Sequence, residues 1–149
     1  MKGGYRPHSL KAGSKILDIE SNLYKDAMRH ALSTKFSQDQ IILVDDLSVI
    51  TKENLEECLD ALSVPKDASV YFLYGSAEPA YTLNEACDAK NAGLPVLTRR
   101  QKKKADPLCM KYYIPVAARH VSLLPLMRSE FIVLDKEAVE VLEELYHLN

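Results

Sequence analysis

Lysine and arginine side chains gather in one stretch of the sequence, TRRQKKKADPLCMKYY, which begins at Thr98. Residues 97–128 hold eight Lys/Arg against one Asp/Glu. Cations at this density neutralise phosphates, so the cluster is typical of binding to a polyanion such as a nucleic acid. A solvated surface loop explains the same composition, and a docking loop for an acidic protein over residues 97–113 is a further alternative.

The first 17 residues carry positive charge without any acidic residue. Glycine and proline recur there, and they disfavour a helix. Residues 1–20 are therefore predicted to form an extended basic arm. A remnant of a transit peptide is the alternative, although Arg and Ser are sparse for such a segment.

The net charge of −2 is an average over segments of opposite sign. Residues 1–40 carry +3, residues 41–96 carry −7, residues 97–128 carry +7 and residues 129–149 carry −5. Acidic stretches repel RNA, so residues 52–60 and 137–144 are expected to face solvent or neighbouring proteins.

Two adjacent carboxylates, Asp45 and Asp46, follow an apolar run at the place where α/β proteins often position functional groups. The stretch ILVDD resembles the first strand of receiver domains, in which such a pair helps to hold Mg²⁺. Receiver domains need a further Asp after the third strand, whereas the run VYFLY here ends in Gly75-Ser76. A loop or helix-capping role for both aspartates is favoured, and a Mg²⁺-dependent receiver-like regulator or enzyme is the alternative function.

Other catalytic signatures are missing from the sequence. It has no glycine-rich phosphate loop and no GxSxG motif. The three scattered cysteines, Cys58, Cys87 and Cys109, are expected to be free thiols. Neither these cysteines nor the four histidines show metal-ligand spacing. His120, beside Arg119, is expected to be a structural or surface histidine. We therefore expect no enzyme activity, no metal and no cofactor.

The elements that must position these residues alternate between helix and strand. The chain has 149 residues, of which 47% are hydrophobic and 27% charged, as expected for one globular domain. It has no apolar run long enough to cross a membrane. Helices are predicted over 21–36, 52–62, 80–92 and 136–146, with a short helical turn at 121–126. Strands are predicted over 41–44, 70–74, 94–98, 112–118 and 131–134.

This alternation predicts a three-layer α/β/α sandwich with a mainly parallel sheet of about four strands. The apolar run 41–44 is typical of a strand covered on both faces. Pro115 limits how well the strand around it can pair. Ser21 or Asn22 is predicted to cap the first helix and Asp135 the last one.

Two stretches of the sequence resemble the ribosomal protein L-four family of the large ribosomal subunit. The first is YKDAMRHALSTKF followed by QIILVDDLSV, and the second is HVSLLPLMRSEFIVLDKEAVEVLEEL. The family's helix and strand patterns are met by Ala27, Met28, Arg29, Ala31, Leu32 and Ser33, then by Val44, Asp45, Asp46 and Leu47. The family's ending is met by Leu123, Leu124, Phe131, Ile132, Val133, Leu134, Asp135, Lys136, Ala138 and Leu142.

The resemblance implies a parallel α/β sandwich with an architectural role, bound to large-subunit ribosomal RNA and to neighbouring ribosomal proteins. It implies no catalysis, no small-molecule substrate and no membrane. Basic residues are then expected to contact phosphates, and tyrosines, Tyr113 among them, to stack on bases or pack in the core. The expected RNA-binding residues are Lys2, Tyr5, Arg6, Lys11, Lys15, Arg29, Arg99, Arg100, Lys102, Lys103, Lys104, Lys111, Tyr112 and Arg119.

The sequence also departs from the family's pattern. The family usually carries an N-terminal portion and a long basic loop that reaches toward the peptide exit tunnel, whereas only the short arm precedes residues 21–149 here. The basic insertion near 99–113 is not typical. Truncation together with insertion favours a divergent organellar form, and we expect a location in the mitochondrial ribosome.

Overall fold

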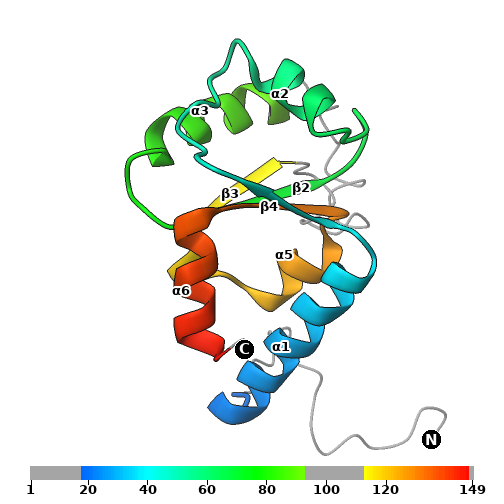
Figure 1. The fold of residues 1–149 in the computed structure, drawn as a ribbon, viewed down its shortest axis with the longest axis vertical. Helices are drawn as coiled ribbons and strands as arrows, with labels where there is room; N and C mark the ends of the chain where they lie inside the picture. The colour runs from blue at the N-terminus through cyan, green and yellow to red at the C-terminus, as the bar shows by residue number, and fades with distance from the viewer. Residues whose placement is uncertain (1–17, 93–112, 148–149) are drawn as a thin grey trace, which may run out of the picture.

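The computed structural model describes residues 18–92 and 113–147. Within them, four strands form one sheet in the order β1-β4-β2-β3, and every neighbouring pair is parallel (Figure 1). The strands are β1 (Ile41–Val44), β2 (Val70–Tyr74), β3 (Tyr113–Ala117) and β4 (Phe131–Asp135). The predicted parallel sheet is confirmed. The strand predicted over 94–98 lies outside the described residues.

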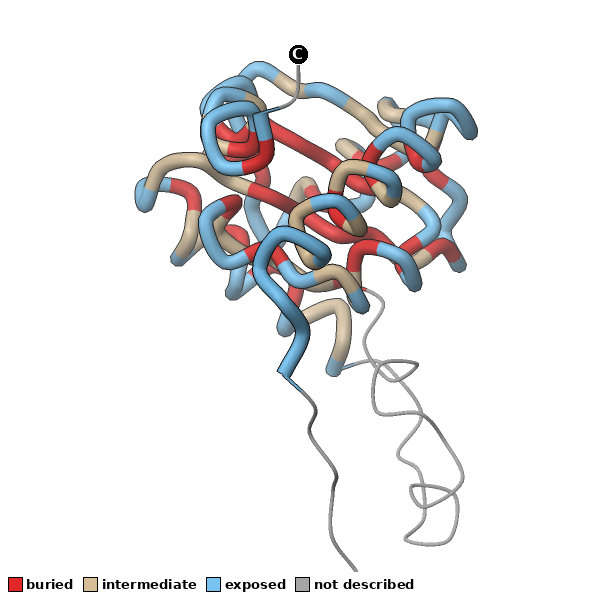
Figure 2. Tube along the Cα trace, turned by 90° about the horizontal axis from the view of Figure 1, so that it is seen from below, coloured by how far each residue is buried: buried red, intermediate tan, exposed pale blue. Residues whose placement is uncertain are grey.

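Helices cover both faces of the sheet, so the predicted three-layer sandwich is confirmed (Figure 1). One face carries α2 (Leu55–Ala61) and α3 (Ala80–Asn91), and the other carries α1 (Ser21–Ser37), α5 (Leu123–Arg128) and α6 (Lys136–Tyr146). A short 3₁₀ turn, η2, spans Ala118–His120. Figure 2 shows the buried residues concentrated on the strands between the helix layers. No helix among the described residues is long and apolar enough to cross a membrane.

The order of the strands places β4 inside the sheet and β1 at its edge. The chain runs from β1 to β2 and β3, and then returns to insert β4 between β1 and β2. The side chains of β2 and β4 are therefore almost all buried, whereas Leu43 of β1 is 65% exposed. The prediction that residues 41–44 are covered on both faces is wrong, because the last strand takes the inner position.

Strand β3 forms the opposite edge and pairs with β2 alone among the described strands. Pro115 lies in this strand, opposite Phe72 in the register. Proline lacks an N–H group and is tolerated at sheet edges, so Pro115 suits this position, although all of β3 pairs with β2 and the limited pairing predicted for the strand is not seen on that side.

The starts of two helices and the cap of a third differ from the sequence prediction. Helix α2 begins at Leu55 rather than 52, because the Asn54 side chain accepts from Thr51 N–H at 2.7 Å and donates to the Val49 carbonyl at 2.9 Å. The predicted turn at 121–126 is the helix α5, which begins two residues later. Helix α1 has Glu20 at its N-cap position without a side-chain cap, so neither predicted cap is correct.

The predicted cap of the last helix is confirmed and joins three elements. Asp135, at the end of β4, is buried, and its carboxylate accepts from the Ala138 N–H of α6 at 2.6 Å. The same carboxylate accepts from the Gly75 N–H, after β2, at 3.1 and 3.2 Å. A β-carbon on Gly75 would lie 2.4 Å from the Glu137 backbone carbonyl carbon. Glycine is therefore required where β2 passes the first turn of α6.

Replacing Gly75 with Ala should lower the free energy of unfolding by about 1–3 kcal/mol, the usual cost of overpacking. The added methyl group meets backbone atoms, which can yield only if α6 shifts away from β2. Urea denaturation measures the loss, and Ser76→Ala, next to it in the chain, is the control with an expected change within about 0.5 kcal/mol. Equal stability of Gly75→Ala and the natural chain would contradict the close approach.

Candidate nucleic-acid interface

Charge divides sharply between the described body and the rest of the chain. Residues 18–92 and 113–147 hold nine Lys/Arg and twenty Asp/Glu, a net charge of −11. The remaining residues hold ten Lys/Arg and one Asp, a net charge of +9. The body as a whole repels a polyanion, so favourable contacts with phosphates have to come mainly from residues 1–17 and 93–112.

Several cations of the body are bound by the body itself. Lys90 of α3 forms an ion pair with Glu56 of α2, and Lys136 forms one with Asp45 at 2.5 Å. Lys35 of α1 is buried and donates to the Ser129 carbonyl at 2.5 Å. Burial lowers the pKa of this ammonium group, an effect that nearby Glu130 opposes. The Lys90–Glu56 pair joins α3 to α2, and Lys35 joins α1 to the residue after α5, a role that the sequence did not reveal for Lys35.

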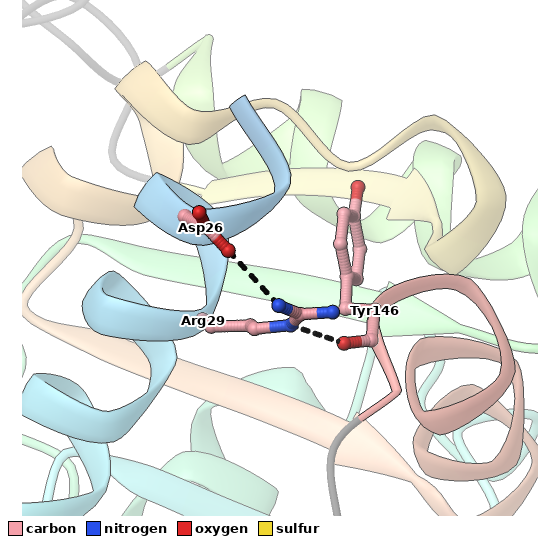
Figure 3. Close-up of polar contacts among 3 residues, drawn as sticks. All are labelled: Asp26, Arg29 and Tyr146. Carbon is pink, nitrogen blue, oxygen red and sulfur yellow. Dashed lines mark hydrogen bonds and ion pairs between the residues drawn. The ribbon is translucent and has the colours of Figure 1, made fainter. Parts of the chain in front are cut away.

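Arg29 of α1 joins two helices of the same face (Figure 3). Its Nε donates to the Tyr146 carbonyl at 2.6 Å, and its Nη1 donates to Asp26 Oδ1 at 2.9 Å. Tyr146 is the last residue of α6, so the guanidinium satisfies a carbonyl that has no partner within the helix. A positive charge at this end also complements the helix dipole. Arg29 therefore has a structural role besides the phosphate contact predicted for it.

Arg119 is the other predicted RNA-binding residue within the described part of the chain. It is exposed in η2, directly after β3, and has no hydrogen bond or ion pair to another described residue. Its neighbour His120 is exposed, as predicted. The remaining predicted residues lie outside the described residues: Lys2, Tyr5, Arg6, Lys11, Lys15, Arg99, Arg100, Lys102, Lys103, Lys104, Lys111 and Tyr112.

Tyr113 does not form part of an RNA-stacking surface. It is buried in β3, its ring stacks on Phe72 with centroids 6.5 Å apart, and its hydroxyl donates to the Lys66 carbonyl. Of the two roles expected for this tyrosine, base stacking and packing in the core, the structure shows packing in the core.

The Asp45–Asp46 pair has structural partners. Asp45 pairs with Lys136, and Asp46 accepts from the Ser48 N–H at 2.8 Å and also from the Ser48 hydroxyl. The bond from the hydroxyl, and then the bond from the N–H, lower the pKa of Asp46. These contacts form a turn after β1, which agrees with the loop role predicted for the pair. They do not favour the Mg²⁺-dependent alternative.

Parallel sheets usually bind ligands in a crevice at the carboxyl ends of their strands. Here the buried Asp135 carboxylate lies at that edge, between the end of β2 and the start of α6. Within residues 18–92 and 113–147, no group of three His, Cys, Asp or Glu side chains is placed to hold a metal ion. The Asp135 carboxylate at this edge accepts hydrogen bonds from the backbone N–H groups of Gly75 and Ala138.

Cys58 and Cys87 are free thiols, and Cys109 lies outside the described residues. Burial raises the pKa of Cys87 to about 12, so its thiol is protonated at neutral pH.

The acidic residues of the two predicted acidic faces are exposed, on and beside α2 and on α6. They are Glu53, Glu56, Glu57 and Asp60, and Glu137, Glu140, Glu143 and Glu144.

The described residues form a parallel α/β sandwich with a net charge of −11, and the rest of the sequence carries +9. Residues 1–145 match the model of the ribosomal protein L4/L1 family, and the chain belongs to this family. The match includes both basic segments and the two stretches that carry the resemblance in sequence. Family membership supports a structural role in the ribosome. A search of curated proteins gave no match.

Substitutions at the two described arginines should separate structural from electrostatic effects. Arg29→Gln should lower the free energy of unfolding by about 1 kcal/mol, because the Tyr146 carbonyl loses a charged donor. Arg119→Gln should change it by less than about 0.5 kcal/mol, since the side chain is exposed without a partner in the described body. Chemical denaturation of both variants measures the difference, and equal stabilities would contradict the role assigned to Arg29.

Proposed function

We propose that this protein is an architectural, non-enzymatic constituent of the mitochondrial large ribosomal subunit that binds and positions ribosomal RNA. The observation that carries the proposal is the match of residues 1–145 to the ribosomal protein L4/L1 family. The structural use of Asp45, Asp46 and Asp135 at the carboxyl edge agrees with a scaffold rather than an enzyme.

Residues 1–17 and 93–112 supply the RNA contacts in this proposal. Their ten cations against one acid give them the charge that the body, at −11, lacks. Phosphate contacts release condensed counterions, so binding weakens steeply with salt. Such contacts fix position and orientation and carry no sequence information by themselves. Exposed Arg119 adds a contact from the body.

The mitochondrial location rests on how the sequence departs from the family's pattern. The basic segment near 99–113 is not typical of the family. Divergence of this kind favours an organellar ribosome. The partners are then mitochondrial large-subunit RNA and the neighbouring ribosomal proteins.

Replacing Arg99, Arg100, Lys102, Lys103 and Lys104 with Gln should reduce incorporation into large subunits by about tenfold or more, because up to five phosphate contacts are lost. Incorporation is measured by sedimentation of the tagged chain in cells that also express the natural protein. Gln variants of three lysines on the body, Lys25, Lys52 and Lys66, form the control and should incorporate normally.

Unchanged incorporation of the five-residue variant would contradict the RNA-binding role of this segment. Weakened assembly through contacts that resist RNase would instead favour a docking loop for an acidic protein. In vitro, the variant should also show a shallower dependence of RNA affinity on salt, because fewer counterions are released.

A further inference from the structure

An apolar groove lies between α1, β1 and α6, on the face of the sheet that α2 and α3 do not cover. Its volume is about 360 Å³. Apolar side chains from all three elements line it, and Phe36 and Leu43 are 73% and 65% exposed. Exposed apolar side chains that gather in one groove leave apolar surface in contact with water, which a partner can cover.

The groove exists because the helix layer does not reach the outer strand. Leu43 of β1 lies beside Leu134 of β4 in the register, and both line the groove. Leu134 is 4% exposed, whereas Leu43 is 65% exposed. The cover provided by α1 and α6 thus ends between two adjacent strands. Among the described strands, none pairs with the outer edge of β1.

The rim of the groove is acidic on the α6 side. Glu143 lines the groove, Glu140 and Glu144 lie next to it on the same helix, and all three are exposed. Two described cations on the helices that flank the groove have partners elsewhere, since Lys136 pairs with Asp45 and Arg29 binds the Tyr146 carbonyl and Asp26. The surface is therefore apolar along the floor and negative along one side.

The apolar floor and the acidic rim of the groove favour one class of binding partner. RNA is repelled by the glutamates and by the net charge of −11 on the body. A small molecule is usually held by several convergent polar groups, whereas among the described residues only two polar ones, Ser33 and Glu143, line this groove. A segment with apolar anchors and flanking Lys/Arg side chains complements both the floor and the rim.

We propose that the groove between α1, β1 and α6 is the docking site for a basic segment of a neighbouring protein. Its apolar side chains lie over Phe36 and Leu43, and its Lys/Arg side chains lie opposite Glu140, Glu143 and Glu144. The basic and apolar chemistry of the segment follows from the groove, while its assignment to another ribosomal protein rests on the proposed function.

Photocrosslinking in cells tests the proposal with the full-length chain. A benzophenone amino acid replaces Phe36 or, separately, Leu43, and after irradiation the lysate is sedimented and the adducts are identified by mass spectrometry. The matched control carries the probe at Tyr81, which is 78% exposed on α3, on the other side of the sheet.

The expected result is one protein adduct from both groove positions, in a peptide with more Lys/Arg than Asp/Glu and with apolar side chains. Its yield should fall at least tenfold in the variant Glu140→Lys, Glu143→Lys and Glu144→Lys. It should be retained in a variant with the same charge change on the opposite face, Glu53→Lys, Glu57→Lys and Glu85→Lys.

Adducts with RNA, with a second copy of the chain or with the chain's own residues would overturn the proposal. So would an adduct with an acidic peptide, or a yield no greater than that from Tyr81. The sedimentation profile reports on the proposed function separately. If the chain sediments apart from the large subunit, that function fails, and the adduct in those fractions still decides whether a basic protein segment occupies the groove.

Discussion

The hydrogen bonds of the buried Asp135 carboxylate join β4, α6 and the end of β2. It ends the inner strand β4, caps α6 through Ala138 N–H and holds Gly75 N–H at the end of β2. Both donors are backbone groups that lack another partner at these positions, and burial makes an unmade hydrogen bond costly. The carboxylate thus fixes two strands and a helix at the edge where parallel sheets usually bind ligands.

A second constraint is the separation of charge between the body and its basic segments. The body carries −11 and binds several of its own cations in contacts that join helices, such as Lys90 with Glu56 and Arg29 with the end of α6. The basic segments carry the charge that RNA requires. In our proposals, RNA and protein therefore bind to different parts of the chain. Phosphates contact the basic segments, and a basic protein segment binds the apolar groove with its acidic rim on α6.

Much of the fold follows from local patterns in the sequence. The apolar runs of β2 and β4 predicted buried strands, and Asp135 ahead of an amphipathic helix predicted a cap. These features depend on backbone chemistry within a few residues. The alternation of helices and strands predicted the three-layer sandwich, because parallel strands need crossover connections, which are usually helices.

Local sequence patterns could not predict the order of the strands in the sheet. Four consecutive apolar residues, 41–44, indicate a buried strand, yet β1 lies at the edge because β4 inserts beside it. The groove over Leu43 follows from that order and was missed for the same reason. Likewise, Arg29 meets the Tyr146 carbonyl across 117 positions of sequence, so its charge alone suggested only a phosphate contact.

Sedimentation of mitochondrial lysate from the native organism, probed for this protein with and without RNase, tests whether it is part of the mitochondrial large subunit. The protein should co-sediment with the large ribosomal subunit, and RNase treatment should collapse that peak. A light peak that RNase leaves unchanged, in mitochondria that contain intact large subunits, would contradict it.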